Sequence, residues 1–166
     1  MTRGVVRGVG TDAVCRVVGR AVEAAEHHRI RREVFVVEQG IFPTSDLDAH
    51  DARTDVLHVV AWVDGVAAGT VRLFPRAAAA AAADTSTREW QGDRLAVLPA
   101  YRSAGVGAPL VRFAMATAAA RGGARMTAHV QLPHRSFFEH LGWTAGAAEV
   151  YAGLPHLAMD VRLPAT

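Results

Sequence analysis

A glycine-rich turn, Arg102-Ser103-Ala104-Gly105-Val106-Gly107, is the part of this sequence whose residue types point most directly to a chemistry. The β-rich run Trp90–Leu98 before it predicts a strand, and the run Ala108–Arg121 after it, which ends at Gly122-Gly123, predicts a helix. A strand, a glycine turn and a helix aim backbone N–H groups and the positive end of the helix dipole at one place, which suits a phosphate group. Glycine leaves that place open, because it has no Cβ and can adopt a positive φ. The sequence therefore predicts a site for a phosphate-bearing cofactor.

Two familiar phosphate loops do not fit this turn. A nucleotide-triphosphatase loop has a lysine after its last glycine, and all 18 basic residues of this chain are arginines. A dinucleotide-binding fingerprint has a third glycine where Leu110 stands, and it follows the first strand of its fold, whereas this turn lies two-thirds of the way along the chain. A structural alternative stays open, in which the glycines only make a tight connection between strand and helix.

The pattern R-x-x-G-x-G at the start of a helix resembles the coenzyme A pyrophosphate loop of the GNAT superfamily of acyl-CoA N-acyltransferases. The strings Leu95–Pro99, Tyr101-Arg102 and Phe137–Trp143 are also similar to that superfamily. Arg31–Gln39, with the acidic loop after it, resembles a bacterial branch that includes a subgroup associated with nitrogen-starvation gene clusters. The resemblance spans residues 14–163. It implies a layered α/β (α+β) fold, in which a mixed, largely antiparallel central sheet is flanked by helices and splayed at its fourth and fifth strands.

Local patterns predict the same order of elements. Val56–Val63 and Ala68–Phe74 are β-rich and flank Asp64-Gly65, which predicts a hairpin. The length fits a single domain over residues 1–166, with residues 77–88, which include seven alanines, as a connector. The other expected elements are a strand at 14–20, a helix at Glu23–Glu38, a polar loop at Pro43–Asp55, a strand at Arg125–Leu132, a short helix at Pro133–His140 and a β-region at Glu149–Leu163.

The resemblance implies acetyl-CoA as the co-substrate and an amino group of a small molecule as the acceptor. In the superfamily, the fourth strand lies beside the thioester and pantetheine, and the glycine loop holds the pyrophosphate. An asparagine that often contacts coenzyme A after the fifth strand corresponds to His134 here. The cofactor-binding residues implied for this chain are Leu95, Ala96, Val97, Arg102, Ser103, Ala104, Gly105, Val106, Gly107, Ala108 and His134.

Acyl transfer to an amine also needs a proton acceptor, because an alkyl ammonium has a pKa of about 10 and is protonated at neutral pH. Glu38 and His129 are the main candidates for this base, and Asp93 and His156 are alternatives. His129 equally fits a hydrogen-bonded core histidine, and Glu38 a solvated carboxylate at a helix end.

The leaving thiolate needs a proton, and here the sequence departs from the superfamily. The usual tyrosine aligns with Phe138, which has no proton to give. Tyr151 is the expected substitute, with Tyr101 and solvent as alternatives. The departure keeps a second function open, a coenzyme A-binding sensor without turnover. A protein or peptide N-acetyltransferase is a third.

The acidic loop supplies the candidates for binding the acceptor. Asp48 and Asp51 would attract a cationic amine, and the alternative is a merely solvated loop. A calcium loop would need glycine where Asp51 stands and glutamate where Leu57 stands. The chain has no H-E-x-x-H pattern, so we expect no metal, and its one cysteine, Cys15, lies in an apolar run that predicts a buried structural thiol.

The composition limits the classes of binding partner that we expect. The formal net charge is +2 and the arginines are scattered, which gives little support for nucleic-acid binding. No strongly apolar run reaches membrane-spanning length, so we expect no membrane association and a cytoplasmic protein. A homodimer is left open.

Overall fold

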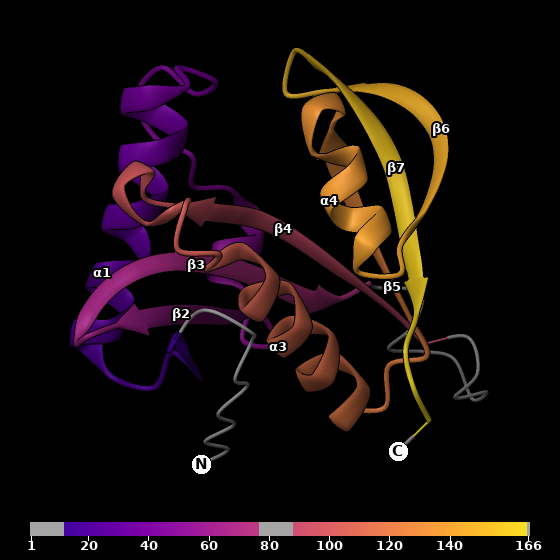
Figure 1. Cartoon of the computed structure of the whole chain (residues 1–166), viewed down its shortest axis with the longest axis horizontal. Coiled ribbons are helices and arrows are strands. Elements are labelled where there is room, and N and C mark those ends of the chain that lie inside the picture. Colours follow the sequence, from indigo (N-terminus) through magenta and orange to yellow (C-terminus); the bar gives the residue numbers. More distant parts are fainter. Residues whose placement is uncertain (1–11, 77–87, 166) are drawn as a thin grey trace. The chain divides into compact units, whose positions relative to one another are not determined.

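The computed structural model describes residues 12–76 and 88–165. Its strands hydrogen-bond in the order β1-β2-β3-β4-β5-β7-β6 (Figure 1). The strands are β1 (Val14–Val17), β2 (Leu57–Val63), β3 (Val66–Pro75), β4 (Glu89–Val97), β5 (Arg125–Gln131), β6 (Thr144–Tyr151) and β7 (Leu154–Arg162). The helices are α1 (Ala21–Arg31), which continues as a π-helix (Arg32–Glu38), α3 (Gly107–Ala120) and α4 (Arg135–His140), with 3₁₀ turns at Ala49–Ala52, Pro99–Tyr101 and Leu132–His134.

The sheet is mixed and largely antiparallel, as predicted. β1 with β2, β5 with β7 and β6 with β7 pair antiparallel, whereas β4 and β5 are parallel. The parallel pairs join Glu89–Gln91 to Arg125–Thr127, the first three residues of each strand. The fourth and fifth strands are therefore joined at their starts, in agreement with the predicted splay.

Two compact units make up the chain. Unit 1 contains the residues up to Arg72 and Arg94–Ala114, and unit 2 contains Leu73–Asp93 and the residues from Met115. The predicted connector at 77–88 lies, apart from Arg88, outside the described residues. The assignment of one domain to residues 1–166 stays a prediction.

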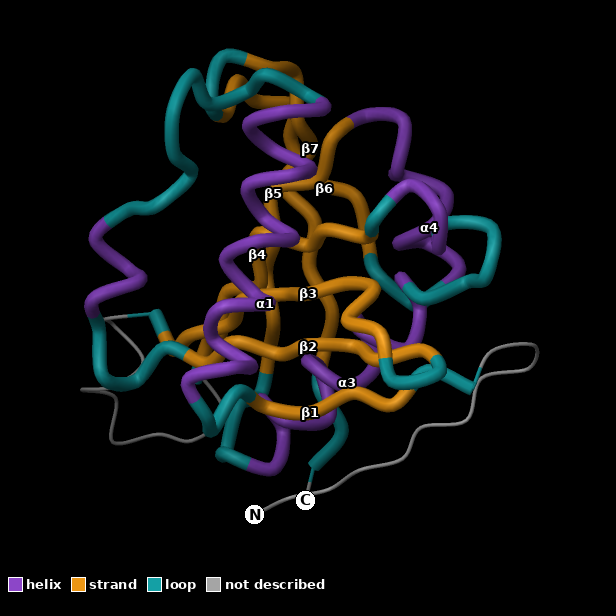
Figure 2. Tube along the Cα trace, turned by 90° about the vertical axis from the view of Figure 1, so that its left-hand side faces the viewer, coloured by secondary structure: helices purple, strands orange, loops and turns teal. Residues whose placement is uncertain are grey.

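Unit 1 is built on the predicted hairpin. Asp64 and Gly65 both have positive φ, 48° and 79°, the conformation of the two-residue turn whose twist matches the flanking strands. Figure 2 shows α1 lying across one face of β2 and β3. The core of this unit consists of Ile30, Val34, Phe35, Val60, Ala67, Ala96 and Leu98.

The helix at the start of unit 1 ends at Glu38 as predicted but differs from its prediction in where it begins and in its type after Arg31. It begins at Ala21 and not at Glu23, because the Glu23 carboxylate reaches back to accept from the amides of Gly19 (2.9 Å) and Arg20 (3.2 Å). From Arg32 onward it is a π-helix, in which the amide of Gln39 donates to the carbonyl of Val34, five residues earlier, at 2.9 Å.

A glycine on β3 allows α3 to approach the sheet of unit 1. A Cβ at Gly69 would lie 2.9 Å from Leu110 Cδ1, 3.3 Å from Val106 Cγ1 and 3.1 Å from the carbonyl of Ala96. A side chain at this position would require Leu110, Val106 and the backbone of Ala96 to shift, so the close packing here favours glycine. The close approach places the first turn of α3 against β3 and β4.

Unit 2 contains the β5–β7–β6 arrangement, with α4 packed beside it (Figure 1). One face of β5 and β7 is apolar and buried, through Met126, Val130, Leu157, Met159 and Val161. The ring of Phe138 on α4 meets Trp143 edge to face at 5.3 Å. β6 begins at Thr144 and not at Glu149 as predicted. The sequence does not reveal the first half of this strand, because Ala145–Ala148 has low strand propensity and contains a register shift that hides the alternation of side chains.

The predicted buried thiol is confirmed. Cys15 is 1% exposed and unpaired, and burial raises the pKa of its thiol to about 12. Among the described residues, no helix is both long enough and apolar enough to cross a membrane.

Candidate active site

The glycine turn has the strand–turn–helix context that the sequence predicts. The chain leaves β4, passes through the 3₁₀ turn Pro99–Tyr101 and enters α3 at Gly107. The amides of Ala104 and Gly105 donate to the carbonyls of Tyr101 and Arg102, each at 3.2 Å. Gly105 has a φ of 71°, a conformation that favours glycine. Ala104 and Gly105 are among the residues implied to bind the cofactor, and their amides are used to close the turn.

The first turn of α3 supplies the remaining amides. The first α-helical hydrogen bond runs from the amide of Leu110 to the carbonyl of Val106, at 3.3 Å. The amides of Gly107 and Ala108 precede it and cannot bond within the helix, and Pro109, the next residue, has no amide hydrogen. Two backbone donors that the helix does not use thus lie at the positive end of the dipole of a 14-residue helix.

Two residues that the sequence assigns to different roles are paired here. The Arg102 guanidinium binds the Glu38 carboxylate through two hydrogen bonds of 2.6 and 2.7 Å, and it donates to the carbonyl of Val97 at 3.0 Å. The hydrogen bond from Arg102 lowers the pKa of Glu38 below its ordinary value. Glu38 is therefore a weaker base than a free carboxylate, and the charge of Arg102 is already balanced. The pair instead connects the end of the π-helix, the end of β4 and the glycine turn.

Replacing Glu38 by Gln tests whether Glu38 is a general base or only the structural partner of Arg102. The pair is partly exposed, 44% for the Arg102 side chain and 35% for Glu38, and such pairs contribute about 0–1 kcal/mol. We expect the KM for acetyl-CoA to rise less than about 5-fold and the rate at saturation to be retained. Loss of a general base lowers the rate by about 10²–10⁴. A fall of that size in Glu38→Gln would therefore show that Glu38 is the base. Glu33→Gln, which breaks the exposed pair with Arg29, is the matched control.

The end of β4 presents two side chains on its less buried side. Leu95 and Val97 are half-buried, whereas Ala96 faces the core of unit 1. The side chain of Ala96 cannot reach a cofactor, so only its backbone stays a candidate for this contact. Arg94, just before Leu95, has a φ of 51°, which is rare for a residue with a side chain.

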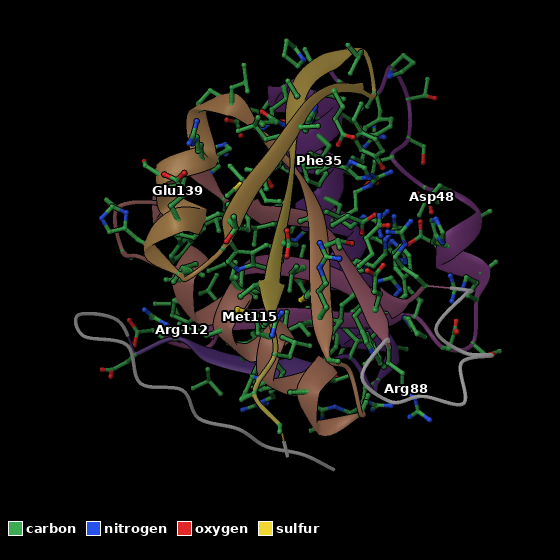
Figure 3. All side chains as sticks on the ribbon, turned by 90° about the vertical axis from the view of Figure 1, so that its right-hand side faces the viewer. Phe35, Asp48, Arg88, Arg112, Met115 and Glu139 are labelled. Carbon is green, nitrogen blue, oxygen red and sulfur yellow. The ribbon has the colours of Figure 1, made fainter. Side chains whose placement is uncertain are left out.

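The acidic loop forms a buried ion-pair cluster with three arginines of unit 1, Arg31, Arg72 and Arg94. The Arg31 side chain is 0% exposed and bonds Asp46 and Asp51, each at 2.6 Å. Arg72 and Arg94 bond Asp48, at 2.6 and 3.3 Å. Figure 3 shows Asp48 beside a dense group of nitrogen- and oxygen-bearing side chains.

This pairing corrects the assignment of Asp48 and Asp51 to acceptor binding. Burial raises the pKa of both carboxyls, but the hydrogen bonds from Arg72 and Arg31 outweigh it, so that both pKa values lie below their ordinary range. Both carboxylates are ionised, but their charge is balanced by buried arginines and is not available to attract an amine. Their position favours a structural role, in which they hold the loop to α1, β3 and β4.

His27, Asp51 and His58 are the described group with metal-ligating atoms close together, within 4.8 Å. Arg31 donates to Nε2 of His27 at 2.9 Å, so Nδ1 of that ring carries the hydrogen that Thr70 Oγ1 receives at 2.7 Å. Burial lowers the pKa of His27 to about 2 and that of His58 to about 4. Since His27 and Asp51 are already bonded and Arg31 would repel a cation, these residues do not fit a metal ion.

In unit 2 the structure brings three predicted residues together with one that the sequence reasoning missed. Nδ1 of His129 is hydrogen-bonded to the carboxylate of Glu149. The ring of Tyr151 stacks on the imidazole of His129, with centroids 4.3 Å apart and planes 4° apart, and His156 meets Tyr151 edge to face at 5.5 Å. A signal for Glu149 was available, because Glu149 and Tyr151 are two residues apart on one strand and share a face.

The remaining predicted residues lie elsewhere. Tyr101 is half-buried against the core of unit 1. His134 is exposed and precedes the first residue of α4. Phe138 is 8% exposed and packs in unit 2, so it has a structural role. His156 is 5% exposed, and its Nδ1 lies 2.8 Å from the carbonyl of Leu154.

Comparison with known proteins agrees with this architecture. The model of the acetyltransferase (GNAT) family matches residues 22–143. A candidate acetyltransferase of Bacillus subtilis (strain 168) is 29% identical over 132 residues, which cover 78% of this chain and 83% of that protein. The crystal structure of a candidate N-acetyltransferase from Lactobacillus plantarum superposes with a TM-score of 0.77 at 23% identity, covering 92% of this chain and 99% of that one. An acyl-CoA N-acyltransferase from Pseudomonas aeruginosa gives a TM-score of 0.73 at 24% identity, covering 90% and 97%.

The family match extends from the start of α1 through the glycine turn to the end of α4. It therefore includes the turn whose amides and helix dipole suit a phosphate. This chain belongs to the GNAT family of acetyltransferases.

Proposed function

We propose that the protein transfers an acetyl group from acetyl-CoA to an amino group of a small molecule. The observation that carries the proposal is the turn from Arg102 to Gly107, which opens α3 with two backbone donors that the helix does not use. The residues that would hold the pyrophosphate are Gly107 and Ala108 through their amides, with the backbone of Val106 beside them. Leu95 and Val97 would line the path of the pantetheine. A cytoplasmic location stays a prediction.

The reaction joins the acceptor nitrogen to the thioester carbonyl carbon. The nitrogen loses a proton to a base, its lone pair attacks the carbonyl carbon, and the C–S bond breaks with its electron pair left on sulfur. The resulting thiolate takes a proton from Tyr151 or from water. Water suffices energetically, because a thiol with a pKa of about 8.5 is a good leaving group near neutral pH.

The test is release of free thiol from acetyl-CoA in the presence of a panel of small amines. We expect turnover with at least one amine and none without an acceptor. Longer acyl-CoA donors assayed in parallel determine the acyl chain. Binding of acetyl-CoA by calorimetry without any turnover would indicate a sensor, and turnover confined to peptide amines would indicate a peptide N-acetyltransferase. Lack of binding would overturn the coenzyme A assignment.

A further inference from the structure

We propose that His129 is the base that removes the acceptor's proton and that Glu149 is the positioning residue that orients the ring and stabilises the imidazolium that forms. This inference rests on the proposed function, and its geometry lies wholly within unit 2. His129 comes from β5 and Glu149 from β6, and β7 runs between these two strands. The two side chains therefore meet across an intervening strand.

The strand register explains how they meet. His129 pairs with Ala158 on β7, and Glu149 pairs with His156, two residues along β7 on the same face. Neighbouring strands are about 4.8 Å apart, so β5 and β6 are separated by about 10 Å. Only long side chains can bridge that distance, and only above a small residue. Ala158 supplies that small residue, which lets the imidazole and the carboxylate come together over β7.

The arrangement selects one nitrogen of His129 for chemistry. Nδ1 bonds the carboxylate of Glu149, which leaves Nε2 as the second nitrogen. In the described part of the chain, no hydrogen bond to Nε2 of His129 is present, and the side chain is 29% exposed. When Glu149 accepts the hydrogen on Nδ1, Nε2 carries a lone pair and can take up a proton.

Stacking completes the positioning. The nearly parallel ring of Tyr151 covers one face of the imidazole and sets the plane in which Nε2 points. The Glu149 side chain is 32% exposed, so the pair lies at the surface of the sheet and not in the core. A buried salt bridge would only stabilise the fold, whereas a half-exposed pair with one nitrogen unused is accessible to an acceptor.

The proton balance follows from this geometry. A proton on the acceptor nitrogen moves to Nε2 of His129, and the carboxylate of Glu149 stabilises the imidazolium that forms. The freed lone pair then attacks the thioester carbon. The proton on Nε2 leaves to solvent or to the departing thiolate, which restores the neutral ring.

Other charged side chains lie on the face of the sheet that carries His129, and their titration could also contribute to the dependence of kcat/KM on pH. They are Glu89 and Asp93 on β4, Arg125 at the start of β5, and His156, Asp160 and Arg162 on β7. Asp160 is paired with Arg125 at 3.0 Å, and His156 is buried. Tyr151 is the remaining titratable side chain against the ring.

The experiment compares Glu149→Gln and His129→Gln with the wild type and with Glu139→Gln. Glu139, which is labelled on α4 in Figure 3, forms an exposed pair with Arg135, so Glu139→Gln removes a carboxylate from a cationic partner outside the sheet. The measurements are kcat, the KM for acetyl-CoA and the dependence of kcat/KM for the amine on pH. Melting temperature is recorded for every variant.

We expect His129→Gln to lower kcat by about 10²–10⁴ and to remove the acid limb of the pH profile. Glu149→Gln lowers kcat about 10- to 100-fold and moves that limb to lower pH, since the imidazolium loses its carboxylate. The KM for acetyl-CoA stays constant in both variants. Glu149→Asp restores part of the rate, because it restores the charge.

Two results overturn the inference. With an active wild type, a Glu149→Gln variant that keeps the rate and the pH profile, or loses only melting temperature, excludes the pair while leaving the proposed function intact. If the wild type releases no thiol with any amine, the proposed function fails, and the inference fails with it.

Discussion

We expect that replacing Gly107 by Glu will lower the affinity for acetyl-CoA about 1,000-fold, which calorimetry can measure. Gly107 is the first residue of α3, and its amide is one of the two donors that the helix does not use. A carboxylate placed there occupies the phosphate position and repels the phosphate. Two unit charges 4 Å apart at an effective dielectric constant of about 20 repel by about 4 kcal/mol, which corresponds to that factor.

The matched control is Gly107→Gln, which has the same length and no charge. Gly107 does not have a positive φ, so neither substitution strains the backbone. Gln should cost about 10-fold through its bulk, and circular dichroism should show both variants folded. If Glu and Gln weaken binding equally, the effect is steric and no phosphate lies at the start of α3. Unchanged affinity in both would mean that the turn only connects β4 to α3.

We expect that replacing Arg31 by Met will lower the free energy of unfolding by about 3–5 kcal/mol. Arg31 is fully buried, and it neutralises Asp46 and Asp51, which are 5% and 11% exposed. Its removal leaves carboxylates in a low-dielectric environment without their main partner, and it removes the donor to Nε2 of His27. The measurement is chemical denaturation at neutral pH.

Arg29→Met is the control for this prediction, because Arg29 lies on the same helix, is 46% exposed and pairs with Glu26 and Glu33. It should change the free energy of unfolding by less than about 1 kcal/mol. Equal effects of the two substitutions would show that the buried cluster is not what anchors the acidic loop. A second result bears on function: Asp51→Asn should destabilise unit 1 without raising the KM for the amine selectively.

The elements of the fold could be predicted where one local rule dominates. The hairpin at Asp64-Gly65 and the strand before the glycine turn follow from turn chemistry and from β-rich runs, and both are present as expected. The end of the helix could not be predicted in the same way. Nothing local distinguishes an α-helix from the π-helix that replaces it after Arg31, because the choice depends on tertiary packing.

The candidate site could also be predicted only in part. The glycine turn is a contiguous motif, so its position can be predicted from the sequence. The partners of Asp48 and Asp51 could not be predicted, because Arg31 and Arg72 lie 17 to 24 positions away from these residues. An arginine in a charged helix normally predicts a solvated face. Here the fold buries Arg31, and its ion pairs indicate that the acidic loop has a structural role and does not bind the acceptor.

The length of the π-helix has a consequence for how the length of this chain can vary. A π-helix contains more residues per turn than an α-helix, so a single deletion within Arg32–Glu38 would rewind the segment as α-helix. The wider turn of a π-helix takes up an extra residue with little rotation of the segments on either side, so its removal would leave Glu38 facing Arg102. Val37, which is 69% exposed, is the residue whose loss would disturb packing least. The π-helix is therefore a place where the length of the chain can change by one residue while the glycine turn stays bonded to the preceding helix.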